Sequence, residues 1–395
     1  MFDDQLGYLL ERSPFYRAKL AGCDLGDFAS LPLTDKVELK ATTTRENPFG
    51  AHVCVRREEI VRVYSTSGTT GSPSYIPLTQ SDLDNRIVGS ARSYGASGIG
   101  PGDRVLTTYA AGPFVAGAAL DALNTLGVEH EPVGLGNRER ALLAIEQLEP
   151  TAIVATPSYA EYLMELADLR GSSIRRVLVA GEPMVRARLE EGWGARVTEA
   201  MGIGDVGPSL WGECEEQNGM HLGADEFVYP ELIDPETGAA RAWEDGATGE
   251  LVLTHLRHRA APVLRLRTRD HVQVWASPCR CGRTTPRVRC LGRTDDMLIV
   301  RGVNVFPSAV REVVSGFAPQ VSGRILVKPR APGVKQEPPL PVAVELTDET
   351  PADAGLAAAI RARLRDVLIV QTDVELVPWG SLRRSEYKSR LVAGR

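Results

Sequence analysis

Residues 63–79, VYSTSGTTGSPSYIPLT, gather serine, threonine and glycine behind a short apolar lead. The backbone N–H groups and hydroxyls of such a loop can surround phosphate oxygens, and glycine permits the positive φ and close approach that this requires. The segment lacks the lysine of the common GxxxxGK[ST] phosphate loop. On its own it fits either a polar turn or a phosphate-binding loop of another kind.

Metal-binding residue types occur in two further segments. Cys214 and His221 are separated by six residues, and Cys279 and Cys281 form a C-x-C pair in PCRCGR. Three thiolates and one imidazole are a common tetrahedral ligand set for structural zinc, with no position left open for catalysis. The alternative is a group of free buried thiols with a surface histidine. Three other histidines could serve as ligands but lack a comparable loop setting: His255, His258 and His271.

The order of the predicted elements indicates how these residues are positioned. The first ~60 residues look helical and amphipathic, and strands then alternate with helices. Strands are predicted at 104–112, 151–157 and 174–183, and helices at 116–127, 138–150 and 158–169. This alternation predicts an α/β fold with mixed, mainly parallel sheets covered by helices. From about Asp234 strand–turn units indicate an antiparallel or barrel-like β subdomain, with strands at 231–238, 249–256, 263–270 and 271–277.

The pattern changes again near residue 295. Beyond it helices are predicted at 307–317 and 351–368, and strands at 322–330, 340–348 and 373–380. This is the pattern of a compact α+β module of roughly 100 residues. We therefore expect a large N-terminal domain, residues 1–294, and a small C-terminal domain, residues 295–395.

Composition and charge exclude several classes of function. The chain has 395 residues, a hydrophobic fraction of 43% and a net charge of −6. These values are typical of a soluble globular protein, and the negative charge argues against a nucleic-acid partner. The longest uncharged apolar run, 109–120, is too short and too rich in glycine to span a bilayer, and no segment resembles a signal peptide. Six cysteines are too few for a disulfide scaffold, so we expect a reducing, cytoplasmic compartment.

STSGTTGSP, residues 65–73, resembles the phosphate loop of the adenylate-forming superfamily, whose usual form is SSGTTGxP. Members of this superfamily use ATP and a carboxylic acid to form an acyl-adenylate and pyrophosphate. The resemblance implies that the loop holds the β- and γ-phosphates through Ser65, Thr66, Ser67, Gly68, Thr69, Thr70 and Gly71.

Further motifs of the superfamily follow in order. GEP resembles the turn that contacts adenine, and consists here of Gly181, Glu182 and Pro183. LRTRD resembles the segment whose aspartate, here Asp270, binds both ribose hydroxyls. On the residues alone, Asp270 also fits a strand-end aspartate paired with its flanking arginines.

The hinge and the catalytic lysine of the superfamily also have counterparts. LGRTDDMLIVRGVNVFP resembles the hinge segment, in which Arg293 would bind ribose and Asp295 would be the pivot of a mobile C-terminal domain. GSLRRSEYKSRLV resembles the C-terminal segment whose lysine, here Lys388, reaches the adenylate. A compact cation suits the charge that accumulates when a carboxylate attacks a polyphosphate. Without the motif, Lys388 is more simply a solvated lysine and Asp295 an ordinary turn residue.

The MGIGDVG segment departs most from the superfamily pattern, an aromatic followed by Gly-x-Thr/Ser-Glu. Met201 takes the place of the aromatic, and Gly202 keeps the glycine. Gly204 replaces the hydroxyl residue that touches the α-phosphate, and Asp205 replaces the glutamate that helps hold Mg²⁺. A further aromatic, before RTRD, is Leu266. We expect reduced but real adenylation.

RGVNVFP, ECEEQNGMH and CRCGRTTPR are typical of the phenylacetate–coenzyme A ligase branch. This resemblance implies an aryl or arylacetic acid as substrate, coenzyme A as acceptor, and a structural zinc held by the four Cys and His residues above. It leaves open a homodimer. The acid pocket would be formed by Tyr109, Ala111, Gly112, Phe114 and Gly202.

Two other functions remain open on the sequence. The acyl group could pass to a carrier-protein thiol or to an amine, since the cations available for the phosphates of coenzyme A are scattered: Arg257, Arg259, Arg289 and Lys328. The chain could also be a non-catalytic nucleotide-binding relative, which the altered MGIGD motif alone supports.

Overall fold

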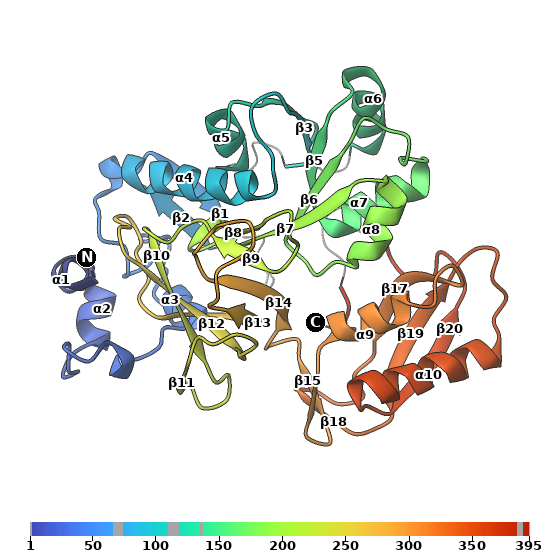
Figure 1. Cartoon of the computed structure of the whole chain (residues 1–395). Helices are drawn as coiled ribbons and strands as arrows, with labels where there is room; N and C mark the ends of the chain where they lie inside the picture. The colour runs from blue at the N-terminus through green and yellow to red at the C-terminus, as the bar shows by residue number, and fades with distance from the viewer. Residues whose placement is uncertain (1, 66–73, 110–117, 135–136, 385–389, 395) are drawn as a thin grey trace. The chain divides into compact units, whose positions relative to one another are not determined.

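The computed structural model (Figure 1) describes residues 2–65, 74–109, 118–134, 137–384 and 390–394. Contacts within the chain define two compact units. The first comprises Met1–Ala155, Ser173–Ala180 and Thr198–Arg289, and the second comprises Thr156–Ser172, Gly181–Val197 and Cys290–Arg395. Both units have an apolar core of their own.

The N-terminal part of the first unit is helical, as the sequence predicted. Its elements are α1 (Phe2–Arg12), α2 (Pro14–Lys19), α3 (Lys36–Ala41) and two short 3₁₀ helices, Phe28–Ser30 and Arg57–Glu59. The Ser13 side chain caps α2, which begins with proline, and Asp35 caps α3. A hairpin follows, in which β1 (Arg62–Ser65) pairs antiparallel with β2 (Tyr75–Leu78).

One sheet of the described residues has twelve strands, in the order β11-β10-β12-β13-β14-β9-β8-β7-β6-β5-β3-β4. The parallel strands at one end are β3 (Arg104–Thr107), β4 (Glu129–Pro132), β5 (Ala152–Ala155) and β6 (Arg176–Ala180). The βα alternation of the sequence therefore appears as predicted. The helices of this part are α4 (Gln80–Ala96), α5 (Ala118–Thr125) and α6 (Arg138–Leu148).

The strands that the sequence assigned to an antiparallel or barrel-like subdomain pair antiparallel and continue this same sheet. They are joined to the parallel strands through β7 (Arg196–Ile203), β8 (Gly207–Glu213), β9 (Met220–Leu222) and β14 (Arg287–Arg293). The remainder are β10 (Val228–Ile233), β11 (Ala240–Arg241), β12 (Thr248–His255) and β13 (Leu266–Trp275). The two strands expected at 263–270 and 271–277 are one strand, β13, because a bulge interrupts the regular pattern without ending the pairing.

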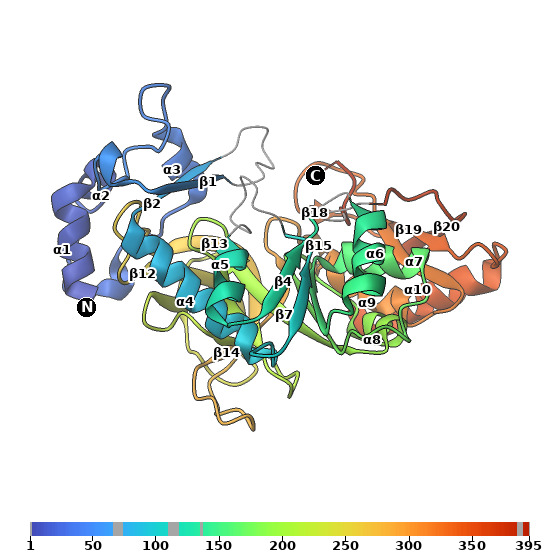
Figure 2. The same cartoon turned by 90° about the horizontal axis from the view of Figure 1, so that it is seen from above.

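Helix α4 packs against β8 and against α5. Helices α4 and α5 lie side by side in both views (Figures 1 and 2). The approach to β8 is very close. A Cβ atom at Gly212 would lie 1.9 Å from the carbonyl oxygen of Ser93, far inside any real contact distance. The Ser93 hydroxyl also hydrogen-bonds the Trp211 carbonyl oxygen at 2.7 Å. Position 212 therefore requires glycine.

The second unit contains α7 (Pro157–Leu166) and α8 (Arg186–Trp193), together with the residues after 289. A three-stranded sheet has the order β17-β19-β20, with α9 packed against β17 and α10 against β20 (Figure 1). A smaller sheet is formed by β16, β15 and β18. Their bounds are β15 (Leu298–Val300), β16 (Val303–Val305), α9 (Pro307–Ser315), β17 (Val321–Val327), β18 (Lys335–Gln336), β19 (Leu340–Leu346), α10 (Ala354–Leu368) and β20 (Thr372–Val377).

No helix in the described part of the chain combines the length and the hydropathy needed to cross a membrane.

Candidate functional site

The predicted phosphate loop connects the two strands of the β1–β2 hairpin. Ser65, at the end of β1, is buried and lies opposite Tyr75, the first residue of β2. The strand pairing thus fixes the two ends of the loop. The rest of the predicted loop lies outside the described residues: Thr66, Ser67, Gly68, Thr69, Thr70 and Gly71. Strand β2 leads directly into α4, whose N-cap is Thr79.

The turn at 204–206, between β7 and β8, contains Gly204 and Asp205. They occupy the motif positions predicted to contact the α-phosphate and Mg²⁺. A Cβ atom at Gly202 would lie 2.0 Å from the Pro208 carbonyl oxygen, so only glycine fits there. The Asp205 carboxylate pairs with Lys36, with 2.7 Å between Oδ2 and Nζ. Met201 packs against the apolar core of the antiparallel strands. The predicted magnesium ligand thus has a protein cation as its partner in this structure.

Asp270 lies on the bulge in β13. Three residues of β13, 268–270, lie opposite the single residue Leu251 of β12. Arg269, in the middle, has a φ of 66°, a left-handed conformation that costs energy for a residue with a side chain. Bulges bend a strand, re-aim its side chains and are common beside active sites. Asp270 therefore has an orientation that a regular strand would not give it.

The two arginines that flank Asp270 pair with other carboxylates. Arg267 binds the fully buried Glu250 through two contacts, Nε–Oε1 at 2.9 Å and Nη2–Oε2 at 2.7 Å. Arg269 pairs with Asp35, which is also the N-cap of α3. Arg267 and Arg269 thus each have a carboxylate partner from another element, Glu250 on β12 and Asp35 at the start of α3.

Replacing Glu250 by glutamine is expected to destabilise the protein by about 3 kcal/mol, because it leaves the Arg267 guanidinium without a compensating charge. Asp35→Asn is the matched control. It weakens the partly exposed pair with Arg269, which is worth at most about 1 kcal/mol, and asparagine keeps the helix cap. The two losses are measured by denaturant unfolding. If the two variants lose the same free energy of unfolding, the Glu250–Arg267 pair stabilises the bulged strand no more than the partly exposed Asp35–Arg269 pair does.

The turn predicted to contact adenine follows β6. Gly181 has a φ of 101°, which glycine adopts without strain. The Glu182 carboxylate accepts a hydrogen bond of 2.8 Å from the Ser158 backbone N–H, in the first turn of α7. Negative charge at a helix N-terminus is stabilising, so this contact fixes the turn that Pro183 completes.

Tyr109, a predicted acid-pocket residue, is buried in the core of the parallel strands. Its hydroxyl lies within hydrogen-bond distance of the carbonyl oxygens of Ala155, 3.3 Å, and Ala180, 3.2 Å. These residues end β5 and β6, so Tyr109 joins the carboxyl ends of adjacent parallel strands. Ligands of open α/β sheets bind at this edge.

Arg293 and Asp295, the predicted ribose ligand and hinge pivot, pair with each other. Their two contacts are Nε–Oδ1 at 2.8 Å and Nη2–Oδ2 at 2.7 Å, and each side chain is about half exposed. An exposed ion pair of this kind is worth at most about 1 kcal/mol, so a bound nucleotide can displace it at small cost. Other predicted site residues lie outside the described part: Lys388, Ala111, Gly112 and Phe114.

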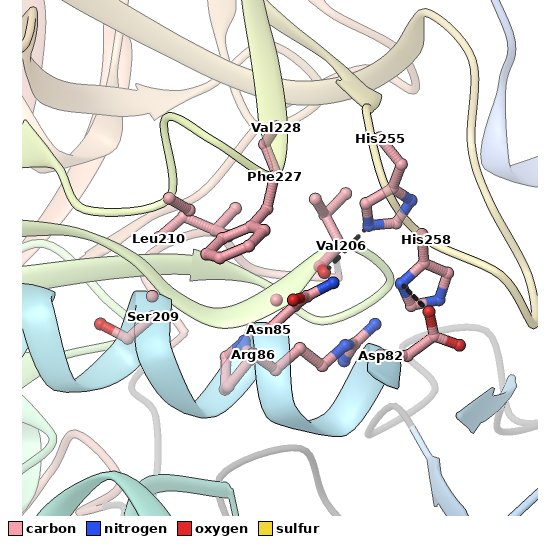
Figure 3. Close-up of a pocket in the computed structure, with 14 residues that line it drawn as sticks. Asp82, Asn85, Arg86, Val206, Ser209, Leu210, Phe227, Val228, His255 and His258 are labelled. Carbon is pink, nitrogen blue, oxygen red and sulfur yellow. Dashed lines mark hydrogen bonds and ion pairs between the residues drawn. The ribbon is translucent and has the colours of Figure 1, made fainter. Parts of the chain in front are cut away.

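Two hollows in the first unit differ in size. The smaller, about 20 Å³, lies between α4, β8 and the end of β12, and is lined by buried Asp82, Arg86, His255 and His258 (Figure 3). Ligand pockets usually measure about 300–1,000 Å³, so it cannot hold an organic acid. The larger, about 770 Å³, is lined by residues of α1, of segment 53–59 and of the start of α4. Neither lining includes a residue predicted for the acid pocket.

The structure brings Cys214, His221, Cys279 and Cys281 together, from the end of β8, from β9 and from the loop between β13 and β14. Their ligand atoms all lie within 4.8 Å of one another. The Sγ atoms of Cys214 and Cys279 are 3.8 Å apart, and Cys281 Sγ is 3.4 Å from His221 Nε2. Tetrahedral zinc, with bonds of about 2.3 Å to sulfur and 2.0–2.1 Å to nitrogen, requires separations of roughly 3.8 and 3.6 Å. The donor set and its spacing therefore fit zinc.

The protonation state of the imidazole also suits a metal. Burial, with Arg283 and Arg287 nearby, lowers the pKa of His221 to about 4, so the ring is neutral at pH 7. Neutral imidazole is the form that binds metals. The competing histidines lie elsewhere, His255 and His258 beside α4 and His271 on β13.

Comparison with known proteins gives the family. Residues 22–255 match the AMP-binding enzyme family, and residues 302–395 match the AMP-binding enzyme C-terminal domain. A phenylacetate-coenzyme A ligase of Thermus thermophilus is 36% identical over 96% of this chain and 92% of its own length. The phenylacetate-coenzyme A ligase of Escherichia coli is 34% identical over 97% of this chain and 91% of its own. The crystal structure of a 2-hydroxyisobutyryl-CoA ligase with 2-HIB-AMP, in the postadenylation state, has a TM-score of 0.88 and 28% identity, over 99% of this chain and 87% of that one.

The chain therefore belongs to the AMP-binding enzyme family, the adenylate-forming enzymes. Within it, the chain is a member of the phenylacetate–coenzyme A ligase branch and an acid–thiol ligase. The sequence prediction of both family and branch is confirmed.

Sequence reasoning missed two residues that pair with residues of the predicted site or beside it. Lys36, the partner of Asp205, lies in LPLTDK, which reads only as a turn before a helix. Glu250, the partner of Arg267, looks like an ordinary polar residue in a strand pattern. The available signal was a glutamate within the apolar strand pattern GELVLTHL and an arginine 17 residues later, but only the sheet register joins them.

Proposed function

We propose that this enzyme uses ATP and Mg²⁺ to convert a carboxylic acid into an acyl-adenylate and then transfers the acyl group to coenzyme A. The observation that carries the proposal is the match to phenylacetate-coenzyme A ligases over 96% of the chain. By this match the acid is an aryl or arylacetic acid. The motifs for phosphate, adenine, ribose and hinge, which follow in the order of the family, support it.

The reaction has two halves. A carboxylate oxygen first attacks the α-phosphorus of ATP, and the bond to pyrophosphate breaks. The sulfur of coenzyme A then attacks the acyl carbon, AMP leaves, and the thiol proton is released. Catalysis of the first half depends on positioning and on donors aimed at the developing negative charge.

The residue roles follow the motifs. We assign phosphate binding to 65–71, adenine contact to 181–183 and ribose binding to Asp270 and Arg293. Asp205 is the residue assigned to Mg²⁺, which when bound neutralises phosphate charge. Support for Asp270 comes from the bulge at 268–270, because strained backbone of this kind clusters at functional sites.

The C-terminal segment supplies the catalytic cation. We assign 1–294 to an N-terminal domain and 295–395 to a mobile C-terminal domain that pivots at Asp295 and carries Lys388. The separate match of 302–395 to a C-terminal domain family supports a boundary in this region. The acid pocket is assigned to Tyr109, Ala111, Gly112, Phe114 and Gly202, where Phe114 would pack on the acid.

The four-ligand cluster is assigned to structural zinc. All four ligands are protein groups, so the metal would have no open coordination position and no part in the chemistry. Its effect would be to join the end of β8 and strand β9 to the loop between β13 and β14.

An acceptor other than coenzyme A is the second candidate. The cations considered for the phosphates of coenzyme A are engaged with neighbours: Arg289 stacks on Trp275 at 5.6 Å, and Lys328 pairs with Glu375 at 2.7 Å. Arg259 lines the larger hollow. A carrier-protein thiol or an amine would need no such cations. A homodimer is the assembly that the branch suggests.

One assay separates these functions. ATP–pyrophosphate exchange is measured over a panel of aryl, arylacetic and aliphatic acids, and coenzyme A is then added to the acid that supports exchange. Exchange followed by thioester formation supports the proposal. Exchange without a thioester favours another acceptor, and no exchange with any acid favours a non-catalytic nucleotide-binding relative.

The double substitution Gly204→Thr with Asp205→Glu is expected to raise the adenylation rate. It restores a hydroxyl to the α-phosphate position and lengthens the carboxylate by about 1.5 Å. A hydrogen bond to a charged group is worth about 1.5–3 kcal/mol, or roughly 10- to 150-fold in rate if it acts in the transition state. Gly204 is not among the described glycines with positive φ, so its backbone conformation does not disfavour a β-branched residue.

The rate is measured by pyrophosphate exchange at saturating acid. The control is the double variant Gly204→Ala with Asp205→Glu, which restores the longer carboxylate but not the hydroxyl. A folded double variant no faster than the wild type would show that the departures in this motif do not limit the enzyme.

A further inference from the structure

We propose that Arg86 is a positioning residue for adenylation, which holds the β7–β8 turn from within the protein. The inference rests on the proposed function, because it concerns the turn that carries Asp205. Arg86 belongs to α4, more than 100 residues earlier in the sequence, and no motif of the superfamily pointed to it.

Three consecutive carbonyl oxygens of the turn face buried donors. The Arg86 guanidinium donates to Gly204 O at 3.5 Å, through Nη1, and to Asp205 O at 3.1 Å, through Nη2. His255 Nε2 lies 3.1 Å from Val206 O, and this contact is drawn in Figure 3. Each contact restrains one peptide plane, so the backbone at 204–206 has little freedom to rotate. The direction of the Asp205 side chain follows from this backbone.

Both donors are in the right protonation state. Arg86 is 6% exposed, and burial lowers its pKa to about 10, against the attraction of Asp82 and Asp205, so it stays charged at neutral pH. Burial, with His258 and Arg86 nearby, holds the pKa of His255 well below its usual value. The neutral ring accepts the Val263 N–H at Nδ1, 3.1 Å, and its Nε2 therefore carries the hydrogen donated to Val206.

Asp82, which is fully buried and lies one helical turn before Arg86, holds the start of α4 in place. Asp82 accepts the backbone N–H groups of residues 79, 259 and 260, at 3.0, 2.6 and 2.9 Å. It also lies 3.4 Å from the Nδ1 atom of His258, whose ring stacks on His255 with 4.2 Å between centroids. The start of α4 and the loop after β12 are thus fixed to each other.

This arrangement links two segments assigned to the nucleotide. Strand β2, which follows the phosphate loop, runs directly into α4. Arg86 then connects α4 to the turn that carries Asp205. We infer that α4 keeps the two segments in register, so that the triphosphate and the carboxylate of Asp205 meet in one geometry.

The test uses the full chain with Arg86→Gln, Arg86→Lys and the control Ser93→Ala. Ser93 is on the same helix and bonds β8 at Trp211 O and Ser209 Oγ, but it does not touch the turn. The measurements are calorimetric binding of ATP·Mg²⁺, pyrophosphate exchange, thioester formation from a synthetic acyl-adenylate, and thermal unfolding.

Arg86→Gln is expected to weaken ATP·Mg²⁺ binding and to slow pyrophosphate exchange by about 10²-fold, because a small misplacement of reacting groups costs about this much in rate. Thioester formation by the folded fraction should be nearly unchanged. Arg86→Lys should fall in between, because one ammonium cannot span two carbonyls as a guanidinium does. In an Asp205→Asn background the effect of Arg86→Gln should largely disappear, since both changes act on one group.

Three results would each overturn the assignment. Arg86→Gln could slow both half-reactions equally, or Ser93→Ala could show the same selective loss of adenylation. The rate losses of Arg86→Gln and Asp205→Asn could also simply multiply in the double variant. If Arg86→Gln does not fold, the same comparison is made with Arg86→Lys. Wild-type protein that neither binds ATP·Mg²⁺ nor supports exchange would reject the proposed function itself, which is a different result from an active wild type with unselective variants.

Discussion

Replacing Lys388 by alanine is expected to slow acyl-adenylate formation by orders of magnitude, and thioester formation from preformed adenylate much less. We assign Lys388 to the negative charge that develops on the triphosphate as the carboxylate attacks ATP, and no polyphosphate takes part in the second half-reaction. Removing one such donor typically costs about 10²–10³-fold in rate. The two half-reactions are measured separately, by single-turnover adenylation and by thioester formation from synthetic adenylate.

Arg390→Ala is the matched control for Lys388. It removes an exposed cation two residues away in the same segment and should leave both rates near those of the wild type. Lys388→Arg keeps the charge but changes its shape, so it should recover part of the adenylation rate. The role assigned to Lys388 is wrong if the alanine variant loses both half-reactions equally.

Protein purified without chelator is expected to contain one zinc ion per chain. Cys279→Ser should abolish stoichiometric zinc binding and lower the melting temperature, because metal-binding free energy is folding free energy. A loss of about 1 kcal/mol lowers the melting temperature of a domain of roughly 150–250 residues by about 2–4 °C, and we expect a considerably larger decrease. Adenylation by the fraction that stays folded should change much less than the melting temperature. Metal content is measured by mass spectrometry and stability by calorimetry.

Cys290→Ser gives the matched control for the metal centre. Cys290 is a partly buried thiol of β14, near the cluster in sequence but not part of it. It should keep its zinc and lose little stability. Metal-free wild-type protein, or an equal loss of stability in both serine variants, would contradict the assignment.

Local patterns in the sequence predicted much of the fold. The βα alternation between 104 and 180 gives the parallel strands, because buried strands and amphipathic helices have different periods. The C-terminal elements α9, β17, β19, α10 and β20 appear where predicted. The grouping of Cys214 with Cys279 could be inferred because core packing seldom places thiols in glycine-containing loops, whereas a shared metal ion does.

Other features depend on distant pairings that no local pattern encodes. The bulge beside Asp270 arises from the register of β13 against β12, and nothing in LRTRD shows that Leu251 will face three residues. The ion pair of Asp205 with Lys36 joins residues 169 apart. Arg86 looks like an exposed helix residue until α4 is placed against β8. The continuous sheet of antiparallel and parallel strands could not be predicted for the same reason, since strand order is set by tertiary packing.

The contact between Gly212 and Ser93 has a consequence for how such an enzyme can diversify. Because the acid pocket is assigned to residues near the strand ends, we expect a change of acid specificity, in nature or in a laboratory library, to come through substitutions there. Any side chain at position 212 would push α4 away from β8, and α4 is the helix that follows the predicted phosphate loop. We therefore expect enzymes that acquire specificity for new acids to keep glycine at position 212, even where much of the remaining sequence has changed.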